Sequence, residues 1–156
     1  MIQILNLKES PHHLEQLAQW HQSQWQHYNH GETLLERIKR MQDYLNDDFI
    51  PSTFIAINET TLLGSVAIVQ HDMEIHQEFS PWIASVFTNK DYRNQGIATK
   101  LIKHMLHQAK LSNIKQCYLF TPDQESFYKK IGWETICHVK YHKELVSIMS
   151  IDTTFF

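Results

Sequence analysis

The sequence predicts a single domain of the α/β class. Short β-rich runs alternate with longer segments whose apolar residues recur at helical spacing. No linker, internal repeat or low-complexity tract divides the chain. A chain of 156 residues in one domain buries roughly two thirds of the surface that it exposes when unfolded. Residues 1–156 are therefore expected to form a single domain.

The first third of the chain predicts a short strand followed by two helices. The strand covers residues 2–5. Ser10 and Pro11 are typical of the N-cap and the first position of a helix. Gly31 interrupts the helical pattern, which then restarts. The first apolar helix face comprises Leu14, Leu17, Ala18, His21, Trp25 and Tyr28, and the second comprises Leu34, Ile38, Met41 and Leu45.

The remaining two thirds predicts six strands and two further helices. Strands are expected over 53–57, 62–69, 81–88, 116–120, 136–142 and 145–151, with one helix beginning at Ile97 and another over 124–131. The longer helix presents one apolar face made by Ile97, Leu101, Ile102, Met105, Leu106 and Ala109. Gly132 is expected to stop the shorter helix, and Lys143-Glu144 to form the turn of the closing hairpin.

Composition excludes several classes of protein. A net charge of -3 and a pI near 6.4 argue against general nucleic-acid binding, which usually needs a basic surface. Nowhere do eighteen apolar residues run together, so no membrane span is expected. Cys117 and Cys137 each stand alone in apolar segments, as in a reduced, cytoplasmic protein.

The segment with the clearest chemical meaning links the strand that ends at Thr88 to the helix that begins at Ile97. It reads Arg93-Asn94-Gln95-Gly96-Ile97-Ala98. The first turn of a helix leaves backbone N–H groups without partners at the positive end of the helix dipole, where phosphate oxygens bind well. Gly96 and Ala98 are small enough for a ligand to approach the backbone closely, and Arg93 can add a charged hydrogen-bond donor. The segment therefore predicts a pyrophosphate site.

Other phosphate-binding motifs do not fit this segment. A Walker loop ends in Gly-Lys-Ser/Thr, whereas Gly96 is followed by Ile97-Ala98-Thr99-Lys100. The dinucleotide fingerprint needs three clustered glycines, and the whole chain has four.

Two motifs together resemble the GNAT superfamily of N-acetyltransferases. Arg93 to Ala98 is similar to its motif A: Arg or Gln, two free positions, Gly, one free position, then Gly or Ala. Roughly thirty residues later, Phe127-Tyr128-Lys129-Lys130-Ile131-Gly132-Trp133 resembles the aromatic-Tyr-x-x-x-Gly-aromatic segment of the family. The resemblance covers most of the chain, to about Ile151. It implies a central mixed sheet, mostly antiparallel and twisted, that is flanked by helices.

The resemblance also implies that acetyl-CoA donates an acetyl group to an amine. The strand that carries motif A would hold the pantetheine arm through exposed backbone groups, and an N–H near Val86 or Phe87 would polarise the thioester carbonyl. The expected cofactor contacts are Val86, Phe87, Thr88, Arg93, Asn94, Gln95, Gly96, Ile97, Ala98 and Thr99.

Tyr128 is the expected general acid, which protonates the departing thiolate; this role follows from the resemblance. The family often has Asn seven places before this Tyr, and here Thr121 stands there. The departure puts in doubt only a secondary CoA contact.

Several residues could remove a proton from the amine, and no motif selects among them. The candidates are Asp72, Glu74, Glu78, His71 and His76, or a water molecule. Trp82 and Ser85 are candidates for the acceptor side, and Trp20, Trp25 and Tyr28 for a wall over the acceptor groove or for core packing. The helix pair over 12–46 would shape the acceptor pocket.

Two further chemistries find no support in the sequence. Neither cysteine has a recognisable His partner, so a covalent acetyl-enzyme is not expected. The eleven histidines include His104 with His107 and the adjacent His12-His13, but no metal-binding spacing, so no metal site is expected.

Three functions remain open. The first is an N-acetyltransferase for a small cationic amine or an exposed amino group, with direct attack in a ternary complex. The second is a module that binds acyl-CoA without turnover. The third is an interaction protein or homodimer, suggested by the closing hairpin and by an exposed tail at Phe155-Phe156.

Overall fold

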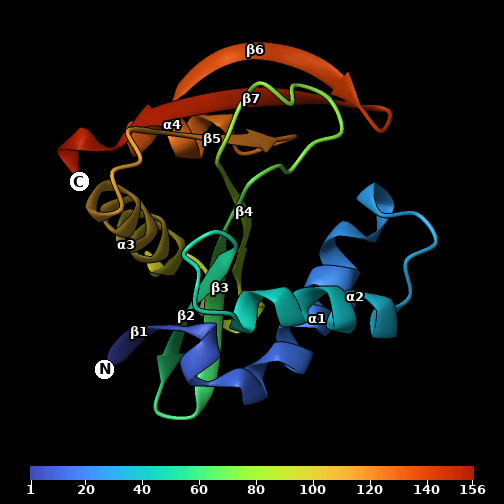
Figure 1. The fold of residues 1–156 in the computed structure, drawn as a ribbon, viewed down its shortest axis with the longest axis vertical. Helices are drawn as coiled ribbons and strands as arrows, with labels where there is room; N and C mark the ends of the chain where they lie inside the picture. The colour runs from blue at the N-terminus through green and yellow to red at the C-terminus, as the bar shows by residue number, and fades with distance from the viewer.

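Seven strands form one sheet in the computed structural model, which describes residues 1–156 (Figure 1). Their order is β1-β2-β3-β4-β5-β7-β6, and only β4 and β5 run parallel. The strands are β1 Ile2–Asn6, β2 Ser52–Asn58, β3 Thr61–Val69, β4 Trp82–Thr88, β5 Gln116–Thr121, β6 Glu134–Tyr141 and β7 Glu144–Asp152. The helices are α1 Leu14–Trp25, α2 Leu34–Met41, α3 Ile97–Leu111 and α4 Glu125–Lys130. The mixed, mostly antiparallel sheet is the one expected.

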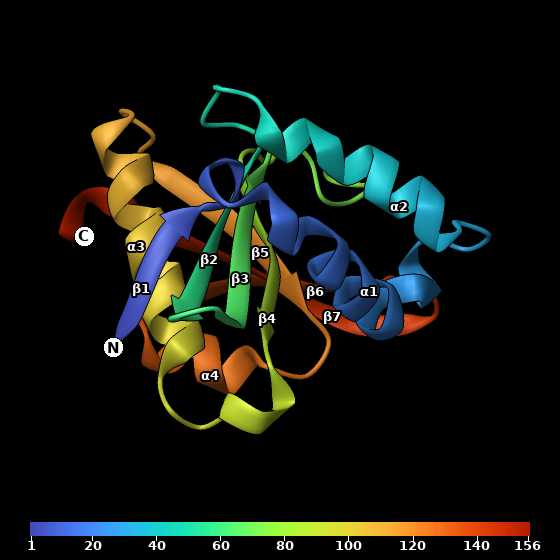
Figure 2. The same cartoon turned by 90° about the horizontal axis from the view of Figure 1, so that it is seen from below.

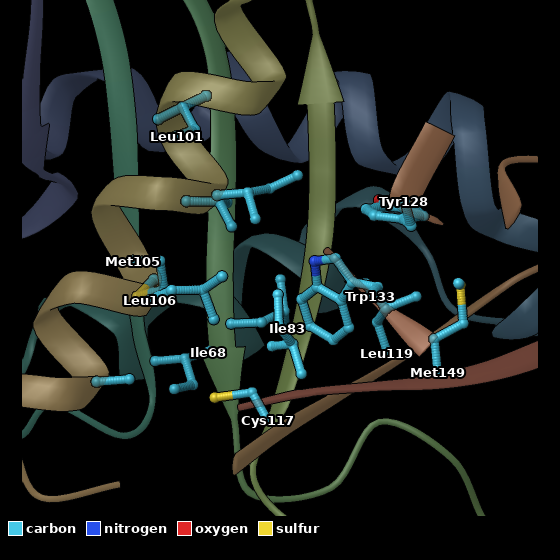
Figure 3. Packing of buried hydrophobic residues seen from close by; sticks show 14 of the residues in the cluster. Ile68, Ile83, Leu101, Met105, Leu106, Cys117, Leu119, Tyr128, Trp133 and Met149 are labelled. Carbon is cyan, nitrogen blue, oxygen red and sulfur yellow. The ribbon is translucent and has the colours of Figure 1, made fainter. Parts of the chain in front are cut away.

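Helix α3 packs on one face of the sheet through the apolar stripe that the sequence predicts. All six residues of that stripe are buried, and Figure 3 shows Met105 and Leu106 beside Ile68 and Ile83 of the sheet. Strands β3 and β4 lie close together at Gly64, where an added Cβ would be 2.5 Å from the carbonyl oxygen of Phe87. This packing fixes where α3 begins relative to the end of β4.

Helices α1 and α2 lie together on the other face (Figure 2). Leu14, Leu17 and Ala18 of α1 and Met41 of α2 join apolar side chains of β2, β3 and β4 in one cluster. Trp25 and Tyr28 are only half-buried, and Tyr28 lies beyond the helix in a 3₁₀ turn over 26–28. The C-terminal end of α1 and the 3₁₀ turn that follows it are therefore not buried in this cluster.

Among the boundaries that differ from the predictions are the start of the first helix and the turn of the last hairpin. Ser10 and Pro11 start a 3₁₀ turn over 11–13 rather than an α-helix, and the Ser10 side chain caps nothing. The turn of the last hairpin is His142-Lys143, with φ of 47° and 68°, so Glu144 belongs to β7. A turn made of two residues in the left-handed conformation matches the twist of an antiparallel strand pair better than an ordinary turn does.

The tail expected to be exposed is only partly so. Phe155 is 87% exposed, but Phe156 packs against the α3 cluster, and its carbonyl oxygen accepts a hydrogen bond from Lys110 at 2.9 Å. No helix combines the length and the apolar character needed to cross a bilayer.

Strands β4 and β5 separate almost as soon as they meet. Their ladder has the single pair Trp82 with Tyr118, next to a hydrogen bond from the Tyr118 N–H to the Pro81 carbonyl at 3.0 Å. On the other side of β4 the register shifts, because Ser65 pairs with Phe87 but Ala67 pairs with Ala84. The sheet therefore opens along the second half of β4.

Candidate active site

A cavity of about 1080 Å³ occupies this opening. It is lined by both sequence motifs and by segments from the other half of the sheet. On the motif side it is lined by Ser85, Val86, Phe87, Thr88, Arg93, Asn94, Gly96, Ile97, Ala98, Thr99, Phe127 and Tyr128. The sequence-predicted contact Gln95 is exposed and does not line it. The cavity brings together nine of the ten expected cofactor contacts and the expected general acid.

The N-terminus of α3 has the features of an anion site. Gly96 is its N-cap, with φ of 78°, and no side chain caps the helix. A Cβ added at Gly96 would meet no atom within 4 Å, so the glycine faces open space. Ile97, Ala98 and Thr99 form the first turn, whose N–H groups have no intrahelical partner. The residues present therefore fit a pyrophosphate.

Arg93 lies beside this helix start but is partly engaged by the protein. Its Nε donates to the Thr88 carbonyl at 3.3 Å, and its guanidinium carbon lies 6.0 Å from the centre of the Phe87 ring. The side chain is exposed, so its terminal nitrogens remain accessible to an anion.

Tyr128 reaches the cavity from α4, and its side chain is 8% exposed. Phe127 and Trp133 pack against its ring edge-to-face, with ring centres 5.1 and 6.0 Å away. Burial raises the pKa of the Tyr128 hydroxyl well above its usual value, and the charge of Asp123 adds to the shift. The hydroxyl therefore carries its proton at neutral pH, as a proton donor must.

The structure divides the five candidate bases into two groups. His71, Asp72 and Glu74 line the cavity, whereas His76 and Glu78 do not. The latter two pair with each other outside it, with His76 Nδ1 3.2 Å from Glu78 Oε2. Proton transfer to either would need a longer path.

Asp72 is distinguished from the other candidates by its electrostatic surroundings. Desolvation raises the pKa of Asp72 to about 7, and Arg40 opposes the shift by a smaller amount, although the residue as a whole is exposed to solvent. A carboxylate with a pKa near the working pH can accept a proton and release it again.

Sequence reasoning missed most of the opposite end of the cavity. Tyr28, Phe120 and Tyr141 bring three rings together there, with centres 5.5 to 6.0 Å apart. Glu144 and Asp123 line the same end, and Glu144 also pairs with His27 at 2.8 Å. These residues come from three distant segments without a shared motif, around positions 28, 120 and 141, so nothing in the sequence joins them.

Two arginines also line this part of the cavity, but both are paired. Glu32 contacts Arg37 at 3.4 Å and Arg40 at 2.9 Å. Glu32 offsets one of these two positive charges, and four carboxylates, those of Asp72, Glu74, Asp123 and Glu144, line the cavity, so negative charge exceeds positive charge at this end.

Some residues considered for the acceptor side lie elsewhere. Trp82 is buried in the core, where its Nε1 donates to the Phe79 carbonyl at 2.8 Å. Trp20 stacks on Phe87 without lining the cavity, whereas Trp25 does line it. Thr121 lines it too, and its hydroxyl accepts a hydrogen bond from the Gln124 N–H at 3.0 Å, in the turn before α4. Nowhere do three His, Cys, Asp or Glu side chains gather so that they could hold a metal ion.

Comparison with known proteins agrees with this geometry. The family model described as the acetyltransferase (GNAT) family matches residues 14–133. A sequence search of curated proteins finds no match.

Several solved structures share the fold over nearly the whole chain. An aminoglycoside 6'-N-acetyltransferase complexed with coenzyme A is 12% identical, with a TM-score of 0.75 over 98% of this chain and 97% of the other. An aminoglycoside 6'-acetyltransferase type Ii is 15% identical, with a TM-score of 0.73 over 98% and 97%. An N-acetyltransferase from Staphylococcus aureus Mu50 is 15% identical, with a TM-score of 0.69 over 99% of each chain.

The fold and the site define an enzyme that takes an acyl group from a CoA thioester. The chain belongs to the GNAT family of acetyltransferases, since the family model covers most of its length. It is an acetyl-CoA-dependent acetyltransferase.

Proposed function

We propose that this protein transfers the acetyl group of acetyl-CoA to a primary amine by direct attack while both substrates are bound. The observation that carries the proposal is the continuous cavity, which joins the uncapped start of α3 and Tyr128 to Asp72 across the opening between β4 and β5. Donor and acceptor can therefore occupy one space without a covalent enzyme intermediate. Cys117 is not suited to form one, because it is fully buried and burial raises the pKa of its thiol to about 12.

The donor half would hold acetyl-CoA through backbone groups and one cation. The first-turn N–H groups of α3 and the Arg93 guanidinium suit the pyrophosphate, and the second half of β4 suits the amides of the pantetheine arm. A backbone N–H at Val86 or Phe87 would then stabilise the negative charge that develops on the thioester oxygen.

The nitrogen of a protonated amine loses two protons, one before it attacks and one as the amide forms, and the sulfur gains one. Asp72 takes the first proton, directly or through water, and so frees the lone pair of the nitrogen. The nitrogen then forms a bond to the carbonyl carbon, the carbon–sulfur bond breaks, and Tyr128 gives its proton to the departing thiolate. The second proton of the nitrogen leaves through water and restores the tyrosine hydroxyl. Of the candidate bases we favour Asp72, because it lines the cavity and because its raised pKa matches neutral conditions.

The acceptor half favours a cationic amine. Asp72, Glu74, Asp123 and Glu144 line it, and the two arginines nearby are paired with Glu32. The aromatic faces of Tyr28, Phe120 and Tyr141 can also contact an ammonium group or the apolar stem of a polyamine. The aminoglycoside acetyltransferases with the same fold are consistent with such an acceptor.

A thiol-release assay tests this function. The purified protein is mixed with acetyl-CoA and separately with polyamines, aminoglycosides, amino acids and peptides with free N-termini. We expect CoA release that depends on one class of cationic amine, with acetylated product visible by mass spectrometry. The alternative function, acyl-CoA binding without turnover, would show as calorimetric binding of acetyl-CoA with no release for any amine.

A further inference from the structure

Beneath the opening of β4 lies a buried hydrogen-bonded chain that the catalytic assignments above do not use. His21 Nε2 lies 3.1 Å from the Ser65 hydroxyl, and that hydroxyl donates to the carbonyl oxygen of Ser85 at 3.0 Å. His21 is 2% exposed and Ser65 is fully buried. The chain links α1, through β3, to the irregular part of β4.

The direction of the hydrogen bonds follows from the protons available. Ser65 has one hydroxyl proton, and the Ser85 carbonyl can only accept, so that proton lies between them. His21 must then donate from Nε2 to the Ser65 oxygen. Burial lowers the pKa of His21 to about 3, with smaller contributions from Arg37 and Arg40, so the ring is neutral and keeps this single arrangement at ordinary pH.

Ser85 needs such support, because its backbone is irregular. It has φ of 51°, in the left-handed region that a residue with a side chain rarely adopts. The register places Ser85 and Val86 together opposite Val66 of β3, and neither has a partner on β5. The ladder therefore does not fix the peptide unit between Ser85 and Val86 in the usual way.

Fixing the Ser85 carbonyl also fixes the N–H of Val86. Both groups belong to one planar trans peptide unit and point in opposite directions. His21 contacts the next part of the strand as well, with its ring centre 6.1 Å from that of Phe87. Residues 85–87 line the cavity, where the thioester carbonyl would lie.

We infer that His21 and Ser65 are positioning residues, which hold the Ser85–Val86 peptide unit so that its N–H is oriented for the thioester. The inference rests on the proposed acetyl transfer. It predicts that losing the chain lowers the rate of the chemical step more than it weakens cofactor binding, because the pyrophosphate is held elsewhere.

Kinetics of matched variants test this role. Ser65→Ala is expected to lower kcat roughly 10- to 100-fold while the Kd for CoA changes less than about threefold. Ser52→Ala is the control, because Ser52 is 1% exposed, its hydroxyl has no partner and it lies outside the cavity. His21→Leu should resemble Ser65→Ala, the double variant should be no slower than either, and His21→Gln, which keeps a donor near Nε2, should recover much of the rate.

A second measurement reports the orientation of the Ser85–Val86 peptide unit and does not require turnover. In amide NMR spectra of the proteins without ligand, Ser65→Ala should shift the Val86 signal strongly, while Ser52→Ala should leave it unchanged. An unmoved Val86 amide, or a kcat for Ser65→Ala equal to that of Ser52→Ala, would overturn the inference. If the wild-type protein acetylates no amine, the proposed function fails, and the NMR result still decides whether the chain orients this peptide.

Discussion

Trp82 and Tyr118 form the single pair that joins β4 to β5, and beyond it the two halves of the sheet separate. The candidate active-site residues lie on or near the opening that begins at this pair. The proposed donor side is built by β4 and the start of α3, and the proposed acceptor side by segments on either side of β4 and β5 in the chain. The geometry leads to four predictions about single residues.

Replacing Tyr128 with Phe removes the proposed proton donor but keeps the ring that packs on Trp133. We expect kcat to fall roughly 100-fold or more at neutral pH, with little change in the calorimetric Kd for CoA. Tyr118→Phe is the control, since Tyr118 lies outside the cavity. Equal losses of kcat and of CoA affinity in Tyr128→Phe would argue against the proton-donor role.

Replacing Gly96 with Glu fills the open space before α3 and adds negative charge at the site of the pyrophosphate. We expect the affinity for CoA to fall by at least about 100-fold, because the substitution opposes the attraction of the helix N-terminus. Gly31→Glu controls for backbone strain, because Gly31 has φ of 80° and an equally open Cβ position but lies outside this cavity. Similar CoA affinity in the two variants would contradict the anion site.

Replacing Asp72 with Asn removes the proposed base. The carboxylate must be unprotonated to act, and its raised pKa of about 7 means that kcat/KM should fall as the pH drops below about 7 in the wild-type enzyme. The variant should be slower by about 100-fold and should lose this dependence, as seen in the ratio of the two pH profiles. Glu78→Gln, at the candidate outside the cavity, should leave the profile unaltered; if it instead abolished the dependence, the base would be Glu78.

Replacing Gly64 with Ala should destabilise the fold. The added Cβ would lie 2.5 Å from the Phe87 carbonyl oxygen and 3.3 Å from side chains of Ile97 and Leu101, so β4 or α3 must shift. We expect the free energy of unfolding to fall by roughly 1–3 kcal/mol in urea titrations, as for other overpacked cores. A change within about 0.5 kcal/mol, typical of surface sites, would mean that β4 moves freely at this point.

Patterns within one segment made much of this protein predictable from sequence. The apolar stripe of α3 repeats at helical spacing, and all six of its predicted residues are buried. The motif around Gly96 predicted a helix start, because its residue types are those that an uncapped, closely approached N-terminus requires. The order of strands and helices followed from the same kind of local pattern.

Features that depend on distant segments could not be predicted in this way. The division of the five candidate bases into three that line the cavity and two that do not depends on how the segment between β3 and β4 folds. The left-handed Ser85 sits in a sequence typical of an ordinary strand, and its support comes from His21, sixty-four positions earlier. Tyr141 and Glu144 reach the acceptor end only because β6 and β7 pair beyond β5.

The early divergence of β4 and β5 has a consequence for how such an enzyme can change. Glu144, Tyr28 and Glu74 come from a hairpin end, a 3₁₀ turn and a connecting loop, and none of the three has a role in the proposed grip on CoA or in the proposed proton transfers. Substitutions at these positions can therefore retune which amine is accepted without disturbing the donor half. A library confined to them is a practical route to new acceptor specificities.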